Sequence, residues 1–157
     1  MDATRSPKVL PTRQVIALVR HSLDVSGQAY VRVTGDSMRP LLRHLRDGVI
    51  LVPPWRIRRG DIVLFDRQNG RCALHRVLRA GKTGFTMAGD AQWHLEENLP
   101  YGQIVGVVSC IDRGGRKIPR ENLFLKMYTF VVTPVTFLRI KGWRALKRLL
   151  KPDRNAG

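Results

Sequence analysis

The chain has 157 residues, of which 43% are hydrophobic and 25% are charged. This length is typical of one domain and is sufficient to bury a core, and the composition is ordinary for a globular protein. The charge is not ordinary, because 28 Lys and Arg against 12 Asp and Glu give a net charge of +16. Such a charge favours nucleic acid, anionic lipid or acidic partners, and it carries no information about the fold.

Cysteine is scarce and shows no metal-binding spacing, since Cys72 and Cys110 form no C-x-x-C pair. Residues 1–13 are polar and lack the apolar core of a signal peptide. No apolar run approaches the roughly 18 residues that a membrane-spanning helix needs. We therefore expect a cytoplasmic protein, soluble or peripheral at the inner face of the membrane, with reduced thiols, no metal and no cofactor.

The first predicted element is a short helix at residues 13–23, which lies in an N-terminal segment assigned to residues 1–28. Apolar residues recur there at the spacing of one helix face, so we expect the helix to pack on that face. The residues concerned are Val15, Ile16, Val19 and Leu23.

A β pattern follows in residues 29–118. Short apolar runs alternate with turns rich in Gly and Asp, and Asn69-Gly70 is a strong hairpin signal between two of these runs. The pattern predicts a mainly β fold, namely a small, curved, antiparallel β sandwich or open barrel. The predicted strands cover residues 30–34, 49–52, 61–66, 72–79, 84–88 and 103–111.

Residues 119–157 are predicted to form a basic amphipathic helical tail. Residues 121–132 favour a helix, and Pro134 interrupts this helix or starts another. The apolar stretch at 127–138 is too short to span a membrane. From residue 135 onward a helical projection separates an apolar side from a basic side. The apolar side holds Val135, Leu138, Trp143, Leu146, Leu149 and Leu150, and the basic side holds Lys141, Arg144, Lys147, Arg148 and Lys151.

Two interpretations of this tail remain open. A basic amphipathic helix with a Trp is typical of an element that lies on an anionic membrane surface. The same pattern also fits a helix that packs on its own β domain and leaves its basic face in solvent.

The stretch at residues 33–41 places one hydroxyl between two backbone restraints. Gly35 can adopt backbone angles that other residues avoid, and Pro40 restricts both its own φ and the conformation of Arg39. A nucleophile needs such rigidity, because a misplacement of about 1 Å can cost roughly 10²-fold in rate. Ser37 is therefore a candidate nucleophile that requires a nearby base. Gly, Ser and Pro are also ordinary turn formers, so a plain turn is the alternative.

His75 is the candidate base, because it lies in the middle of a predicted strand on the same face as Ala73 and Val77. An imidazole on an apolar face is either a core residue with a satisfied hydrogen bond or part of a site. Gly89-Asp90 ends the next predicted strand, so the Asp90 carboxylate can point back toward His75. A simple Gly-Asp turn is the alternative there.

The order of these motifs resembles that of the superfamily of type I signal peptidases and self-cleaving repressors. The resemblance covers about residues 31–108 and leaves the two flanks uncovered. The matching residues, in the family's order, are Gly35-x-Ser37-Met38-x-Pro40, Arg59-Gly60-Asp61-Ile62-Val63 with Leu64-Phe65, His75-Arg76-Val77 and Gly89-Asp90.

The resemblance implies a serine endopeptidase that hydrolyses a leader or precursor peptide through an acyl-enzyme. His75 stands where most bacterial members have Lys, as in the branch typified by the signal peptidase of the endoplasmic reticulum. Ser37, His75 and Asp90 are then nucleophile, base and orienting acid, and Glu96 is the alternative acid. A histidine with the ordinary pKa of about 6.5 is mostly neutral at pH 7 and can take the serine proton.

The sequence departs from the family at two places. Many signal peptidases carry a hydroxyl residue two positions before the nucleophile, where it helps to bind the oxyanion, whereas Gly35 stands there in this chain. We assign Gly35 and Met38 to substrate binding and expect the Ser37 backbone N–H to serve the oxyanion. The usual spanning N-terminal anchor is also missing, so we do not expect a role in general secretion.

Two other functions compete with a peptidase that acts on a separate substrate. A self-cleaving repressor needs a DNA-binding domain ahead of the nucleophile, and only 36 residues precede Ser37. A non-enzymatic basic module with a degenerate site would bind anionic membrane or nucleic acid. The charge favours this module, but Lys and Arg are scattered and no RNA-reading aromatic motif is present, so we do not expect nucleic acid as the partner.

Overall fold

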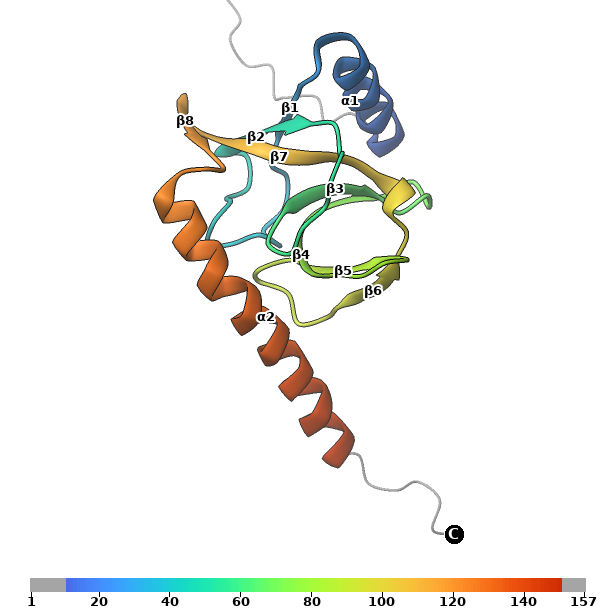
Figure 1. Ribbon diagram of the computed structural model, residues 1–157, viewed down its shortest axis with the longest axis vertical. Coiled ribbons are helices and arrows are strands. Elements are labelled where there is room, and N and C mark those ends of the chain that lie inside the picture. Colours follow the sequence, from blue (N-terminus) through green and yellow to red (C-terminus); the bar gives the residue numbers. More distant parts are fainter. Residues whose placement is uncertain (1–10, 151–157) are drawn as a thin grey trace, which may run out of the picture.

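The computed structural model describes residues 11–150 and shows a mainly antiparallel β fold with a helix at each end (Figure 1). One eight-stranded open sheet has the strand order β1-β2-β7-β3-β4-β5-β6, and β8 pairs with β7. This confirms the predicted fold class. The strands are β1 (Ala29–Arg32), β2 (Asp47–Val52), β3 (Ile62–Asp66), β4 (Cys72–Ala80), β5 (Phe85–Ala88), β6 (Glu96–Leu99), β7 (Ile104–Arg113) and β8 (Arg116–Pro119). A single 3₁₀ turn, η1 (Tyr101–Gln103), precedes β7.

The core has three apolar clusters, and the two larger ones lie against the curled sheet. The larger cluster lies between α1 (Thr12–Ser26) and the sheet, where Leu51 of β2 and Leu42 after the Ser37 stretch are fully buried. The smaller one fills the curl formed by β3, β4, β5 and β7, and Phe65 and Phe85 meet edge to face in it. These two clusters lie on opposite faces of β3, because Ile62 and Leu64 point to the larger cluster and Val63 and Phe65 to the smaller one.

The β3–β4 hairpin follows the predicted turn. Gly70 has φ +78°, a conformation that residues with a side chain rarely adopt. The Arg67 N–H donates to the Arg71 carbonyl and closes the loop. The hairpin register pairs Val63 with His75 and Ile62 with Arg76. This register places His75 and Arg76 on opposite faces of β4.

The C-terminal helix α2 (Leu123–Leu149) is continuous through Pro134, so the predicted interruption at this residue is wrong. The Asn122 side chain caps its first turn by accepting from the N–H groups of Phe124 and Leu125. Buried residues on both sides of Pro134, Thr133 and Thr136 among them, hold the helix on the protein where a proline would otherwise break it.

By length and composition alone, α2 passes the test for a membrane span. It has 27 residues and contains an 18-residue window with a mean hydropathy of 1.4. By this test the expectation that no segment reaches spanning length is wrong, because the helix extends on both sides of the apolar stretch at 127–138. Lys151, assigned to the basic side of the tail, lies outside the described residues.

Truncating Leu51 to Ala tests the core. Leu51 is fully buried, so the substitution should lower the free energy of unfolding by about 2–5 kcal/mol through lost transfer energy and a residual cavity. Leu18→Ala on α1 is the matched control, because Leu18 is 54% exposed and its truncation should change the stability by less than about 0.5 kcal/mol. Urea unfolding followed by circular dichroism measures both, and equal effects would contradict the described core.

Candidate functional site

The Ser37 loop (residues 33–41) is held by hydrogen bonds to the chain on both sides of it. Gly35 has φ +95°, and its N–H donates to His44 Nδ1 at 2.7 Å. The Ser37 carbonyl accepts from the Ala91 N–H at 2.9 Å. The loop therefore lies on the turn that follows β5, and the Ser37 side chain stays partly exposed.

Gly89 allows the Ser37 loop to approach the sheet closely. A Cβ built at Gly89 would lie 3.0 Å from Ser37 Cβ and would collide with the Ser37 carbonyl oxygen. The β4–β5 ladder pairs Arg76 with Ala88, the residue before Gly89. Ser37 therefore contacts the chain at the end of β5, the strand that pairs with the His75 strand. No hydrogen bond joins Ser37 Oγ to His75 within the described part of the chain.

His75 is buried, with 3% of its surface exposed, and its Nδ1 lies 2.9 Å from Glu96 Oε1. Arg67 donates two hydrogen bonds to the same carboxylate, from Nε to Oε2 at 2.8 Å and from Nη2 to Oε1 at 2.7 Å. Burial alone would raise the pKa of the Glu96 carboxyl, but the hydrogen bonds from His75 and Arg67 outweigh it and lower the pKa to about 2.

The state of Glu96 determines the tautomer of His75. An ionised carboxylate can only accept, so the proton of a neutral His75 must sit on Nδ1. The Nε2 atom then carries no proton and can act as a base. A carboxylate on Nδ1 and an unprotonated Nε2 are also what the base and the orienting acid of a hydrolytic triad have.

Asp90 does not support His75, and the prediction that it does is wrong. Both carboxylate oxygens of Asp90 accept from Arg76, from Nε and Nη2 at 2.8 Å each. Asp90 and Arg76 have fully buried side chains on the other side of β4 from His75. Glu96, the alternative acid, occupies the position beside His75. The structure brings it there on β6, a strand that the sequence pattern did not predict.

Met38 is 1% exposed and belongs to the apolar core. This burial contradicts its assignment to substrate binding, because the side chain presents no surface to a ligand. Met38 instead anchors the residue next to Ser37, and Leu42 donates to its carbonyl at 3.0 Å. Gly35 is exposed at the edge of the loop and remains available to a substrate.

Arg67, which holds Glu96 in place, was not expected at the site. A hairpin residue between Asp66 and Gln68 carries no sequence signal for such a role, because its partner lies 29 residues further on. Only the prediction of β6 beside β5 would have brought the two together.

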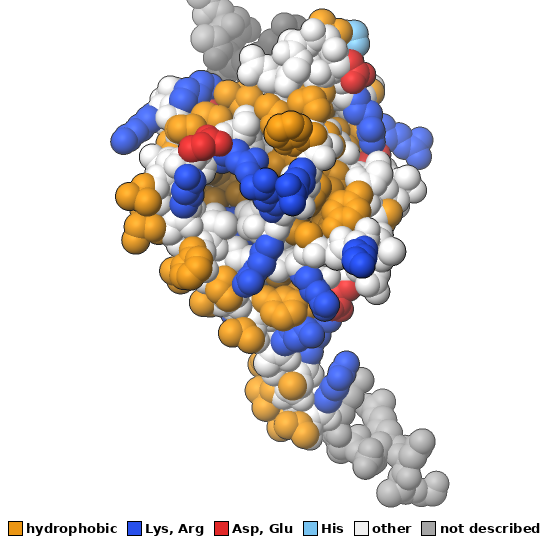
Figure 2. Space-filling view, in the orientation of Figure 1, with side chains coloured by type: hydrophobic (Ala, Val, Ile, Leu, Met, Phe, Trp, Pro, Cys, Tyr) orange, Lys and Arg blue, Asp and Glu red, His pale blue; other side chains and the backbone are white. Residues whose placement is uncertain are grey.

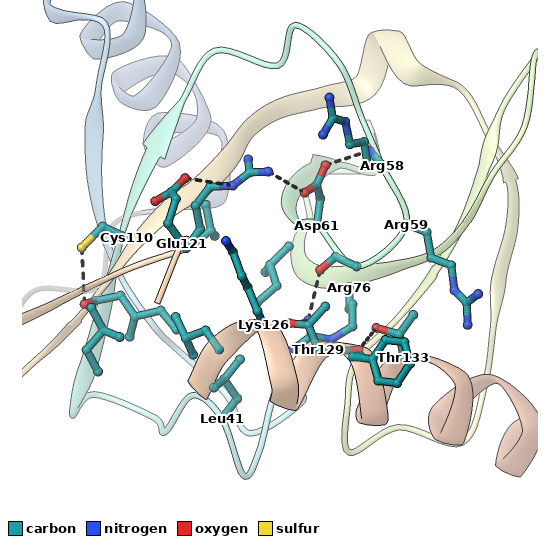
Figure 3. Close-up of a pocket in the computed structure, with 18 of the residues that line it drawn as sticks. Leu41, Arg58, Arg59, Asp61, Arg76, Cys110, Glu121, Lys126, Thr129 and Thr133 are labelled. Atoms are coloured by element: carbon teal, nitrogen blue, oxygen red, sulfur yellow. Dashed lines mark hydrogen bonds and ion pairs between the residues drawn. The ribbon is translucent and has the colours of Figure 1, made fainter. Parts of the chain in front are cut away.

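A cavity of about 810 Å³ lies on the Arg76 side of β4 and is bordered by α2 (Figure 3). Its floor is apolar, with Leu41 and Ile111 among its residues, and cationic side chains stand around it. Arg120 bridges the carboxylates of Asp61 and Glu121 on one wall, at 3.4 Å and 3.6 Å, and Lys126 extends into the cavity from α2. The cavity is thus separate from the His75–Glu96 pair.

Within residues 11–150, no three His, Cys, Asp or Glu side chains are grouped so that they could hold a metal ion. Comparisons of the chain with protein-family models, with curated proteins and with solved structures gave no match. The likeness to signal peptidases therefore rests on the residues and the geometry described above.

The Glu96 ion pairs should make stability depend on acid pH. Because its folded-state pKa is about 2 and thus below the ordinary value of 4.5, ionised Glu96 stabilises the fold above about pH 4.5. This contribution should be lost as the pH falls toward 2. The difference in unfolding free energy between the parent and Glu96→Gln should therefore shrink over that range, as urea titrations at successive pH values can measure.

Glu97→Gln removes an exposed carboxylate from the same strand and controls for the loss of one charge. If the parent and Glu96→Gln differed by a constant amount from pH 6 to the lower end of the range, the described pairing of Glu96 would be wrong.

Proposed function

We propose that this protein is a serine endopeptidase that hydrolyses a peptide bond in a leader or precursor peptide. Ser37 is the nucleophile, His75 the general base and Glu96 the orienting acid. The observation that carries the proposal is the hydrogen bond from the buried His75 to a Glu96 carboxylate that Arg67 keeps ionised.

The chemistry follows from this arrangement. Ser37 Oγ attacks the scissile carbonyl carbon while His75 Nε2 accepts the hydroxyl proton, and the carbonyl oxygen becomes an oxyanion. The imidazolium then gives its proton to the leaving amine as the C–N bond breaks, which leaves an acyl ester on Ser37. Water, deprotonated by His75, attacks this ester, and the imidazolium returns the proton to Ser37 Oγ as the C–O bond breaks and the acid leaves. Glu96 stabilises the imidazolium in both steps.

The backbone of the Ser37 loop supports oxyanion binding at one donor. The Gly35 N–H is committed to His44 and so does not serve this purpose. The Ser37 N–H donates no hydrogen bond within the described residues and is the donor that we assign to the oxyanion. The loss of one oxyanion donor typically costs roughly 10²–10³ in rate. With one donor in place of two, we expect a slow enzyme.

Labelling with a fluorophosphonate tests for an activated serine. We expect one covalent adduct, located on Ser37 by peptide mass spectrometry and absent from Ser37→Ala. His75→Ala should label far more slowly, because the hydroxyl then lacks its base. Ser109→Ala is the control, since Ser109 is a partly buried serine whose hydroxyl donates to the Ile50 carbonyl.

Absence of an adduct across the range in which histidine titrates, about pH 6 to 9, would contradict the proposal. It would favour the alternative function, a non-enzymatic basic module whose peptidase site is degenerate.

The two acids can be distinguished by their effects on the rate of labelling. Glu96→Gln should slow the acylation of Ser37 by about 10²- to 10⁴-fold, because the amide no longer selects the required tautomer. Asp90→Asn should act mainly on stability, since it leaves the Arg76 charge buried without its partner at a cost of about 3–5 kcal/mol.

Labelling rates are compared at a temperature where circular dichroism shows both variants folded, with Glu97→Gln as the control on β6. Normal labelling of Glu96→Gln, together with lost labelling of folded Asp90→Asn, would restore Asp90 as the orienting acid.

A further inference from the structure

The outward face of α2 is apolar over most of its length. Along residues 123–138 it presents large side chains that are between 53% and 82% exposed. A projection of 100° per residue places them on one side, with Lys126 at the edge. The face runs about 22 Å along the helix axis. Its residues are Leu123, Phe124, Met127, Phe130, Val131, Val135 and Leu138. A contiguous patch of this kind is unusual on a soluble monomer and marks an interaction surface.

The inward face of α2 is fastened to the protein by polar contacts along its length. Thr129 accepts from Arg76, the Tyr128 hydroxyl donates to Asp90, and Arg139 donates to the carbonyl oxygens of Asp90 and Gln92. Near its end, Arg144 reaches Glu97 and the Leu95 carbonyl. The helix thus packs on the β domain, and Lys141, Lys147 and Arg148 of its basic side are exposed as expected. Arg139 and Arg144 differ, because they bind the protein, and the apolar side chains of residues 123–138 face out.

These contacts favour an α2 that lies on a bilayer over an α2 that crosses it. A spanning α2 would carry its bound polar partners into hydrocarbon, where unsatisfied groups cost several kcal/mol each. A helix that lies in the plane of the interface keeps all of them and buries only the apolar face.

Cations border this face and match an anionic surface. Phe130 belongs both to the apolar face and to the lining of the large cavity, which Arg58, Arg59 and Lys126 also line. These three side chains are exposed and make no side-chain ion pair within the described residues. Figure 2 shows the apolar side chains along α2 with Lys and Arg side chains beside them on the same side of the molecule.

We propose that α2 docks the protein on an anionic lipid bilayer, with its apolar face in the boundary between headgroups and acyl chains and with Arg58, Arg59 and Lys126 against lipid headgroups. The apolar face inserts into the bilayer, and the cations make binding stronger to negatively charged lipids. Docking in this way holds the protein at the surface without releasing α2 from the sheet.

Vesicle co-sedimentation of the full chain tests the proposal. The parent should bind phosphatidylcholine vesicles that contain phosphatidylglycerol, and binding should weaken as salt is added. The double variant Phe130→Asp/Leu138→Asp should bind at least about tenfold more weakly, because two large side chains can no longer be buried. Both positions are exposed, so folding should be preserved.

The matched control is Leu18→Asp/Val25→Asp on α1, which makes the same charge change at side chains that are 54% and 73% exposed. It should keep most of the binding. The variant Arg59→Gln/Lys126→Gln should lose affinity only for the vesicles that contain phosphatidylglycerol. Equal losses in the α1 and α2 variants, or no binding by the parent, would overturn the proposal. A dimer that sediments in the ultracentrifuge and is lost in the α2 variant, without vesicle binding, would assign the face to a second copy.

Discussion

The buried ion pair between Arg76 and Asp90 is the interaction on which the rest of the structure depends. Neither side chain has any exposed surface, and the guanidinium also donates to the Gly60 carbonyl and to Thr129 on α2. Tyr128 stacks on the guanidinium and donates to the carboxylate. Burial and the nearby carboxylate raise the pKa of Tyr128 to about 12, so its hydroxyl stays a donor. One charge pair thus joins β4, the turn after β5, the turn before β3 and α2.

The ion pair also explains how the candidate site is built on the other face of β4. Because Asp90 is committed to Arg76, the turn at Gly89 is held where the Ser37 carbonyl can accept from Ala91. The acid for His75 must then come from another strand, and β6 supplies it as Glu96. Two ion pairs that involve Arg therefore lie on opposite sides of β4. The Arg76–Asp90 pair holds α2 and the loops in place, and the Arg67–Glu96 pair keeps a carboxylate ionised beside the imidazole.

The sequence predicted the parts of this arrangement that depend on local patterns. The Asn69-Gly70 turn located the β3–β4 hairpin, and the Gly, Ser and Pro of the Ser37 loop marked a constrained hydroxyl. Longer-range features were missed. The segment at β6 is largely polar and shows no alternation, so its pairing with β5 is visible only in the fold. Pro134 favoured a break that tertiary contacts prevent. Gly89-Asp90 correctly indicated a turn after β5. The local sequence does not show, however, that Arg76 binds the Asp90 carboxylate.

In the proposed mechanism, Glu96 fixes the tautomer of His75 and leaves Nε2 free to act as a base. Nitrogen-15 NMR of protein labelled at histidine measures this directly, with His75→Gln identifying the signals. For neutral His75, we expect a protonated Nδ1 with a downfield proton resonance, an unprotonated Nε2, and loss of that resonance in Glu96→Gln. If the His75 proton is on Nε2 and its signal is unchanged by Glu96→Gln, Glu96 does not set the tautomer.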